Sequence, residues 1–183
     1  MERITSETTI RMDWMEASQT QKSSVRCPDA ILAHLVTALF FTLGRPCQVE
    51  ASGDLRHHLW EDLGITTGQL LEKTYTRVKV ARYGWAVVPM DEALVLSSVD
   101  LTRCTLGWQL EDPQVQPEEG FDFGLAREFW AGFCRGAGAT VHVQRLAGFN
   151  AHHVLEAAFK SLGFSLQAAL QPKQGVQSTK GVL

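Results

Sequence analysis

The stretch "GDLRHHLWED", residues 53–62, occurs again in a related form as "GFNAHHVLEA", residues 148–157. Both copies follow the pattern G-x-x-x-H-H-x-x-E and together contain four of the six histidines. A shift of 95 residues, from His57 to His152, superimposes the copies and also places Gly68 on Gly163. Because a pattern that recurs at a fixed spacing is typical of a repeated structural unit, the sequence predicts two similar halves.

The segments around the two motifs extend this repeat. The apolar, helix-like residues 29–44 fall on residues 124–139, and the strand-like "CQVEA" falls on "HVQRL". The first half is predicted as a strand at 7–14, a helix at 29–43, a strand at 47–51 and a helix at 55–72. Between the halves, residues 77–88 and 93–101 have the composition of strands, whereas the polar, proline-bearing stretch 111–120 is typical of a loop.

This order predicts an α/β fold of the α+β sandwich type. It consists of duplicated strand-helix half-domains, each a mostly antiparallel sheet with two helices on one face. We expect residues 1–92 to form the first half-repeat and residues 93–183 the second, which includes an irregular C-terminal tail. Together the half-repeats would make one compact catalytic domain.

Composition limits the partners and the location of the protein. A net charge of −3 gives no reason to expect nucleic acid or an anionic membrane as a partner. The longest apolar run, Ala30–Gly44, is shorter than the roughly 20 residues that span a bilayer, which predicts a buried helix. The four cysteines are scattered without a C-x-x-C pair, and the N-terminal segment lacks the apolar core of a signal peptide, so we expect a reducing, cytoplasmic setting.

The repeated motif has a geometry that suits metal binding. On a helix, residues three or four apart lie on one face, so Glu61 can stand beside His57 or His58, and Glu156 beside His152 or His153. Adjacent helical residues are roughly 100° apart around the axis, since a turn takes ~3.6 residues. The two histidines of one pair should therefore serve different ions, within a subunit or across a subunit contact.

The two remaining histidines complete this interpretation. His34 lies in the predicted apolar helix and His142 in a strand, and a lone histidine on an apolar face is usually a core residue. The repetition favours metal binding instead, because six histidines and two glutamates divide into two sets of three imidazoles and one carboxylate. Nitrogen and oxygen ligands without thiolate favour manganese, iron, cobalt, nickel or zinc as a divalent ion.

The sequence resembles the imidazoleglycerol-phosphate dehydratase family along nearly the whole chain. The similarity is carried by "ITSETTI", "GDLRHHLWEDLGITTGQLL", "ARYGWAVVPMDEAL", "VHVQRLAGFNAHHVLEAAFKSL" and "STKGVL", in this order. The resemblance implies a lyase of histidine biosynthesis that converts imidazole glycerol phosphate to imidazole acetol phosphate. It also implies two manganese ions per active site and a homo-oligomer of 24 subunits with sites between subunits.

The resemblance also assigns candidate residues. It implies a proton-transferring carboxylate at Glu7; because the dehydration requires proton transfer, we add Asp91 and Glu92 of "PMDEAL" as further catalytic candidates. The metal ligands it implies are His34, His57, His58, Glu61, His142, His152, His153 and Glu156. For the substrate's phosphate it implies Arg82, Arg103, Lys160, Ser178 and Lys180, which are suited to charge-assisted hydrogen bonds with a dianion.

Three positions depart from the family's pattern near the expected ligands. Ala33 stands in place of an aspartate before His34, Arg56 in place of an aspartate before the first histidine pair, and Phe149 in place of a glutamate before the second. These departures leave two alternatives open: a related lyase that acts on another phosphorylated hydroxy substrate, and a non-catalytic scaffold assembled by metals. Retention of Glu7 and of the "STKG" tail counts against the scaffold.

Overall fold

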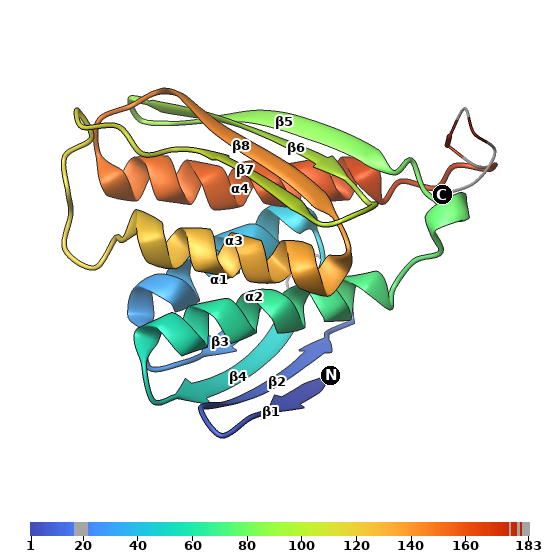
Figure 1. Ribbon diagram of the computed structural model, residues 1–183, viewed down its shortest axis with the longest axis horizontal. Coiled ribbons are helices and arrows are strands. Elements are labelled where there is room, and N and C mark those ends of the chain that lie inside the picture. Colours follow the sequence, from blue (N-terminus) through green and yellow to red (C-terminus); the bar gives the residue numbers. More distant parts are fainter. Residues whose placement is uncertain (17–21, 176, 179, 181–183) are drawn as a thin grey trace.

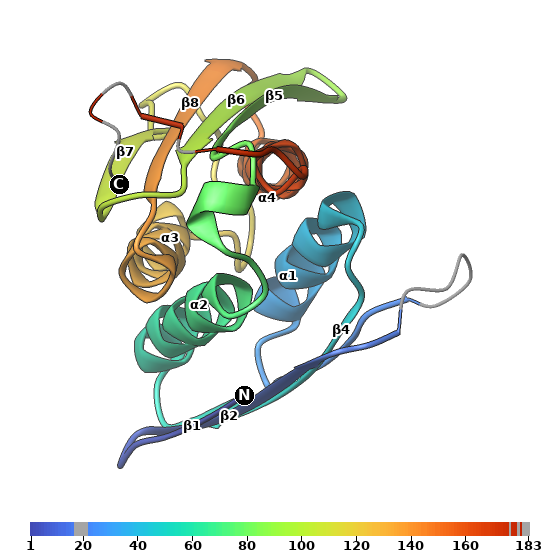
Figure 2. The same cartoon turned by 90° about the vertical axis from the view of Figure 1, so that its right-hand side faces the viewer.

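The computed structural model describes residues 1–16, 22–175, 177, 178 and 180. Two sheets form the outer layers of the molecule, and the helices lie between them in two inner layers (Figure 1, Figure 2). In the described part of the chain, no helix is long and apolar enough to cross a bilayer.

The two halves have the same order of elements and the same sheet topology. The first sheet has the strand order β1-β2-β4-β3 and the second β5-β6-β8-β7. Within each sheet the last pair, β3 with β4 or β7 with β8, is parallel, and the other pairs are antiparallel. The prediction of a duplicated α+β sandwich with mostly antiparallel sheets is confirmed.

The first half comprises β1 (Glu2–Ile4), β2 (Thr8–Trp14), β3 (Ser24–Arg26), α1 (Ala30–Leu43), β4 (Cys47–Gly53) and α2 (Arg56–Glu72). The second comprises β5 (Tyr83–Met90), β6 (Ala93–Asp100), β7 (Thr105–Gln109), α3 (Phe123–Ala137), β8 (Thr140–Ala147) and α4 (Ala151–Ala169). A short 3-10 helix at Arg77–Lys79 lies between the halves. The halves also share their helix caps, because Asp29 and Asp122 cap the N-termini of α1 and α3, and Gly44 and Gly138 follow their C-termini with positive φ.

The boundary between the halves differs from the prediction. β5 pairs with β6 across a tight turn at Asp91 and Glu92, so a boundary after residue 92 would divide one hairpin. The halves instead meet between Glu72 and Tyr83. Neighbouring antiparallel strands need only a short connection, which is why the chain can pass from β5 to β6 without leaving the second sheet.

Glycines bring the inner helices into close contact across the halves. A Cβ atom on Gly68 of α2 would lie 2.4 Å from the Phe133 carbonyl oxygen of α3. A Cβ atom on Gly163 of α4 would lie 1.9 Å from Thr42 Oγ1 of α1. The repeated glycine therefore has the same role in both halves: it allows each helix that carries an H-H-x-x-E motif to pack closely on a helix of the other half.

Candidate metal sites

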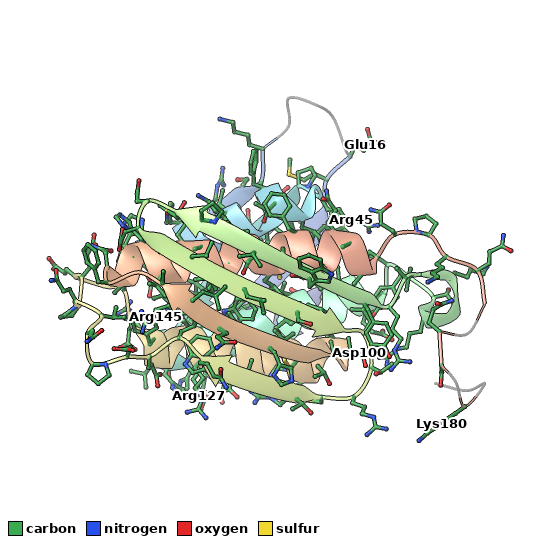
Figure 3. All side chains as sticks on the ribbon, turned by 90° about the horizontal axis from the view of Figure 1, so that it is seen from above. Glu16, Arg45, Asp100, Arg127, Arg145 and Lys180 are labelled. Carbon is green, nitrogen blue, oxygen red and sulfur yellow. The ribbon has the colours of Figure 1, made fainter. Side chains whose placement is uncertain are left out.

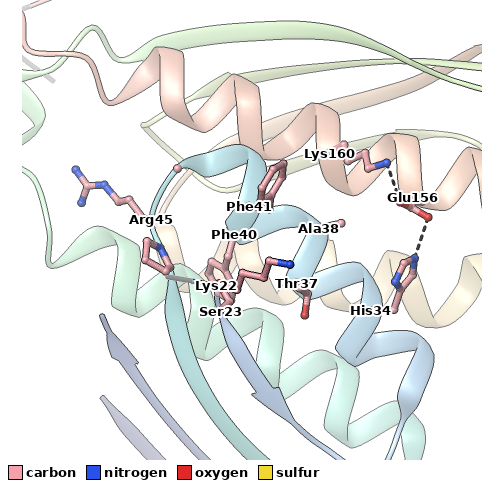
Figure 4. Close-up of a pocket in the computed structure, with 12 residues that line it drawn as sticks. Lys22, Ser23, His34, Thr37, Ala38, Phe40, Phe41, Arg45, Glu156 and Lys160 are labelled. Carbon is pink, nitrogen blue, oxygen red and sulfur yellow. Dashed lines mark hydrogen bonds and ion pairs between the residues drawn. The ribbon is translucent and has the colours of Figure 1, made fainter. Parts of the chain in front are cut away.

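The first candidate site lies between α1 and α4. The Glu156 Oε2 atom is 2.8 Å from His34 Nε2 and 2.9 Å from His152 Nε2. Lys160 donates a hydrogen bond of 2.7 Å to the other carboxylate oxygen, and Figure 4 shows His34, Lys160 and Glu156 directed toward one another. Burial would raise the pKa of Glu156, but the hydrogen bonds from Lys160 and His34 outweigh it and hold that pKa at about 2. Glu156 is therefore an ionised, nearly buried carboxylate.

The ring of His152 is held from two further directions. Phe121 stacks on it with ring centroids 4.3 Å apart and an angle of 21° between the planes. Glu118 Oε1 lies 3.5 Å from His152 Nδ1. One ligand atom from each of His34, His152 and Glu156 lies within 4.8 Å of the others, so the three groups can hold one divalent ion. We name this set the first cluster.

The second candidate site lies between α2 and α3. His57, Glu61 and Glu128 also bring their ligand atoms within 4.8 Å of one another, and we name this set the second cluster. His57 Nε2 is 3.7 Å from Glu61 Oε2, and Arg135 forms an ion pair with the other oxygen of Glu61. The second cluster thus offers one imidazole and two carboxylates.

Glu128 was missed by the sequence analysis. His34 lies ten residues before the C-cap Gly44, and Glu128 lies ten residues before the C-cap Gly138, so the two residues are equivalent in the repeat. The 95-residue shift of the histidine motifs places Phe129 opposite His34, whereas the capping glycines Gly44 and Gly138 are 94 residues apart. Aligning the capping glycines would have found this glutamate from the sequence.

His142 joins neither cluster in the single chain. Its neighbours on β8, Val141 and Val143, are buried on the face of the sheet that the helices cover. Because successive strand residues point to opposite faces, exposed His142 points to the outer face of the second sheet. It lies there beside Gly107 of the neighbouring β7. Among the described residues of one chain, the expected division into three imidazoles and one carboxylate per ion therefore does not occur.

The second histidine of each pair faces other carboxylates. His58 Nδ1 is 2.7 Å from Asp54 Oδ1, and this hydrogen bond raises the pKa of His58. His153 Nδ1 is 2.6 Å from Glu92 Oε2, which raises the pKa of His153 and lowers that of Glu92 to about 2. Each H-H-x-x-E helix thus directs its two histidines to different surroundings.

The three catalytic candidates lie beside these second histidines. Glu7 Oε2 is 3.7 Å from His58 Nδ1, and Asp91 Oδ2 is 3.4 Å from His153 Nε2. Glu7 precedes β2 in the first sheet, whereas Asp91 and Glu92 form the turn before β6, the equivalent strand of the second sheet. Glu92 is also tied to the backbone, since its Oε1 accepts hydrogen bonds from the N–H groups of Phe149 and Asn150.

The phosphate candidates fall into separate groups within one chain. Lys160 lies at the first cluster, on the third turn of α4. Arg82 lies at the opposite end of this helix, where its N–H donates to the Ala169 carbonyl, about 13 Å further along at ~1.5 Å per residue. Its guanidinium makes a two-pronged ion pair with Asp100 and donates to the carbonyl of Gln177.

The other phosphate candidates lie outside the first cluster. Arg103 is exposed and has a φ of 63°. The N–H of Lys180 donates to Ser178 Oγ, while the rest of the "STKGVL" motif, at 179 and 181–183, lies outside the described residues. Lys180 and Asp100, the partner of Arg82, lie toward the same end of the molecule (Figure 3).

A cavity of about 460 Å³ opens beside the first cluster. His34, Glu156 and Lys160 lie at one end of it, and the rest of its wall comes from Lys22, Ser23 and the C-terminal part of α1 with the turn that follows (Figure 4). Ala38, Phe40 and Phe41 make this wall largely apolar, and Lys22 and Arg45 add positive charge. A concave, mostly apolar space with a few polar groups is typical of a small-molecule site.

The duplicated fold and the converging imidazole and carboxylate groups define a protein of two fused half-domains with candidate metal sites between them. The sequence profile of imidazoleglycerol-phosphate dehydratase matches residues 29–166, which include both clusters. The chain belongs to the imidazoleglycerol-phosphate dehydratase family.

Individual relatives agree along the whole chain. It is 44% identical to the imidazoleglycerol-phosphate dehydratase of Pyrococcus furiosus over 186 residues, which cover all of both chains. It is 41% identical to that of Moorella thermoacetica, covering all of this chain and 96% of the relative. A crystal structure of the Pyrococcus furiosus enzyme superimposes with a TM-score of 0.91 over 100% of both chains. One from Staphylococcus aureus, 29% identical, gives 0.79 over 94% of this chain and 98% of the other.

Proposed function

We propose that this protein removes water from imidazole glycerol phosphate to give imidazole acetol phosphate, a step of histidine biosynthesis, as a cytoplasmic homo-oligomer. The observation that carries the proposal is the convergence of His34, His152 and Glu156 in a chain 44% identical to a dehydratase of this name over its full length. The departures at Ala33, Arg56 and Phe149 leave these three residues in place.

We assign one divalent ion, Mn²⁺, to each cluster. The donor sets support this assignment because both consist of imidazole and carboxylate groups without thiolate. His34, His152 and Glu156 would hold one ion, and His57, Glu61 and Glu128 the other. When bound, such ions would supply Lewis acidity toward the leaving hydroxyl and favour the imidazolate form of the substrate's ring.

The chain's own carboxylates would move the proton. The dehydration requires a base for a hydrogen on the carbon next to the one that loses the hydroxyl. Glu92 is a poor candidate because His153 and two backbone N–H groups hold its pKa at about 2. Glu7 stands 3.7 Å from His58, and no backbone N–H of the described residues donates to its carboxylate. We therefore assign proton transfer to Glu7, with Asp91 as a second group and Glu92 as a residue that orients His153.

The assembly would complete both the metal sites and the phosphate pocket. Each cluster supplies three ligand groups from one chain, while His58 and His153 contact Asp54 and Glu92 outside the clusters. Lys160 likewise lies apart from the other phosphate candidates Arg82, Arg103, Ser178 and Lys180. We propose that copies of the chain bring these groups together, in the 24-subunit assembly that membership in the family implies.

The test is an assay of metal-stripped and Mn²⁺-reconstituted protein for imidazole acetol phosphate, with bound metal and assembly size measured on the same sample. We expect turnover only in assembled protein that holds two ions per chain. Full metal loading without turnover would contradict the substrate assignment and leave the two alternatives, another phosphorylated hydroxy substrate or a non-catalytic scaffold. Turnover in fully stripped protein would remove the metal assignment.

A further inference from the structure

The Arg56 side chain lies where three segments of the chain meet. Arg56 is the first residue of α2, and its Nε donates a hydrogen bond of 2.7 Å to Asp29 Oδ2. Its Nη2 donates one of 3.1 Å to the carbonyl of Gly120. One guanidinium therefore connects the start of α2 to the residue before α1 and to the loop before α3.

Asp29 is a fully engaged carboxylate. Its Oδ1 accepts hydrogen bonds from the N–H groups of Ile31 and Leu32 as the N-cap of α1. Its Oδ2 accepts from Trp60 Nε1 at 2.8 Å as well as from Arg56. Only 6% of its side chain is exposed, so Arg56 supplies the opposite charge that a nearly buried carboxylate requires.

Both contacts of Arg56 lead to residues of the first cluster. Asp29 begins the helix that carries His34. Gly120 precedes Phe121, whose ring stacks on His152. The turn is closed by a hydrogen bond from the N–H of Phe121 to the carbonyl of Glu118, and the Glu118 carboxylate lies 3.5 Å from His152 Nδ1.

The turn 118–121 has little room to move and replace its hydrogen bond from Arg56 with another contact. Gly120 has a φ of 82°, and a Cβ atom there would lie 2.9 Å from Ile31 Cγ1, so the turn is pressed against α1.

The planar guanidinium of Arg56 donates in two fixed directions at once, which a lysine ammonium does not reproduce. An aspartate, which the family resemblance implies at this position, would repel Asp29 and could not donate to the Gly120 carbonyl.

We propose that Arg56 is a positioning residue for the first cluster: it fixes the start of α1 and the turn 118–121 so that His34 and His152 are held ready for the ion. This inference rests on the proposed metal site. Groups that orient metal ligands without touching the metal typically contribute about 10–100-fold to metal affinity, and Arg56 would act in this way from α2.

The test compares R56Q and R56K with the unmodified protein by calorimetric titration of the metal-free chain with Mn²⁺. Hydrogen–deuterium exchange of the peptide that contains residues 118–121 is measured on the same metal-free samples. The control is R11Q, which removes an exposed arginine whose Nε also donates at 2.7 Å to a carboxylate, that of Glu2. We expect R56Q to weaken binding at one site about 10–100-fold and to speed exchange of the turn, R56K to retain part of both, and R11Q to change neither.

A double-variant cycle tests the route through Phe121. If Arg56 acts on His152 through the turn, F121L alone weakens Mn²⁺ binding and the loss in R56Q/F121L is smaller than the two single losses combined. Unchanged Mn²⁺ affinity in R56Q, unchanged exchange of the turn, or independent losses in the cycle would overturn the inference. If R56Q does not fold, R56K decides.

Failure of the proposed metal sites can be distinguished from failure of the inference on Arg56. An unmodified protein that binds no Mn²⁺ would remove the metal assignment itself, whatever the variants do. Exchange of residues 118–121 in metal-free R56Q would then still decide whether Arg56 holds the turn.

Discussion

His34 and Glu156 are 122 residues apart in the chain, yet His34 Nε2 and Glu156 Oε2 are 2.8 Å apart. The contact joins the two half-repeats, because His34 lies on α1 and Glu156 on α4. Lys160, one turn further along α4, donates to the other oxygen of the same carboxylate. The Glu156 carboxylate thus contacts His34, Lys160 and His152.

Removing the charge of Glu156 should abolish binding at the first cluster. We expect E156Q to lower Mn²⁺ affinity there at least about 100-fold, since the change affects a direct ligand and not only a group that orients one. Calorimetry on the metal-free variant, with circular dichroism to verify folding, would measure this loss. Retention of both ions at their original affinity would remove Glu156 from the ligand set.

Variants of Glu128 and His142 should differ in the number of metal ions that the chain holds. If Glu128 is the ligand, E128Q should reduce the metal content from two ions per chain toward one, whereas H142Q should leave it unchanged, because carboxylate oxygen is a ligand that Mn²⁺ favours. Elemental analysis of dialysed protein gives the count for both variants. The reverse result would restore His142 and require a second copy of the chain to bring it to the cluster.

The repeated glycine should be intolerant of a methyl group. In G163A the new Cβ would meet Thr42 Oγ1 at 1.9 Å and the Leu39 carbonyl oxygen at 2.6 Å, which forces α4 away from α1. We expect a loss of about 1–3 kcal/mol or more in the free energy of unfolding, together with weaker Mn²⁺ binding at the first cluster. Denaturant titration measures the first effect. G124A is the control, because its Cβ would meet only Asp122 Oδ1, at 3.1 Å; equal losses in the two variants would contradict the argument from close helix packing.

Replacing Asp29 should lower the free energy of unfolding by an amount that depends on pH. D29A removes the cap of α1 and leaves the buried Trp60 N–H without its acceptor, so we expect a loss of about 2–4 kcal/mol near neutral pH. Burial would raise the pKa of Asp29, but hydrogen bonds from Trp60 and Arg56 outweigh it and lower that pKa below its usual value.

The direction of the pH effect follows from this lowered pKa. The charged form is favoured in the folded protein, so its contribution is fully present above the usual pKa of an aspartate, about 3.9, and is lost as the pH falls through the lowered folded value. Denaturant titrations of the unmodified protein and D29N between neutral pH and acid should therefore converge at low pH. A difference that stays constant down to acid would show that the charge of Asp29 has no part in it.

The sequence was sufficient for the fold because the repeat combines two independent signals. The histidine motifs fixed the register of α2 and α4, and apolar periodicity identified α1 and the long strands. The short strands β1, β3 and β7 were missed, since three to five residues are too few for alternation to be recognised. The predicted boundary between the halves lies ten or more residues after the observed one. The sequence of residues 83–90 predicts a strand, but it does not show whether that strand pairs within the first sheet or the second.

The candidate site was harder to predict than the fold. The spacing in the sequence indicates that the two histidines of a pair have different partners. It gives no information on which helices pack together, and the helix packing decides the partners of His34 and His57. His142 stays a predicted metal ligand: its position on a strand between two buried valines directs it to the outer face, where a second copy of the chain would have to complete the site. Glu128 carries a carboxylate where the repeat has a histidine, so the histidine pattern alone does not predict it.

The crossed packing of the inner helices has a consequence for the origin of the two clusters. Each cluster takes residues from both halves, so one half alone, as a free polypeptide, would hold neither. Two identical copies of such a half, related by a twofold axis, would hold both, and the two would be identical. Joining the copies into one chain removes that constraint: each cluster can then change by mutation without the other, as the histidine at position 34 and the glutamate at position 128 illustrate.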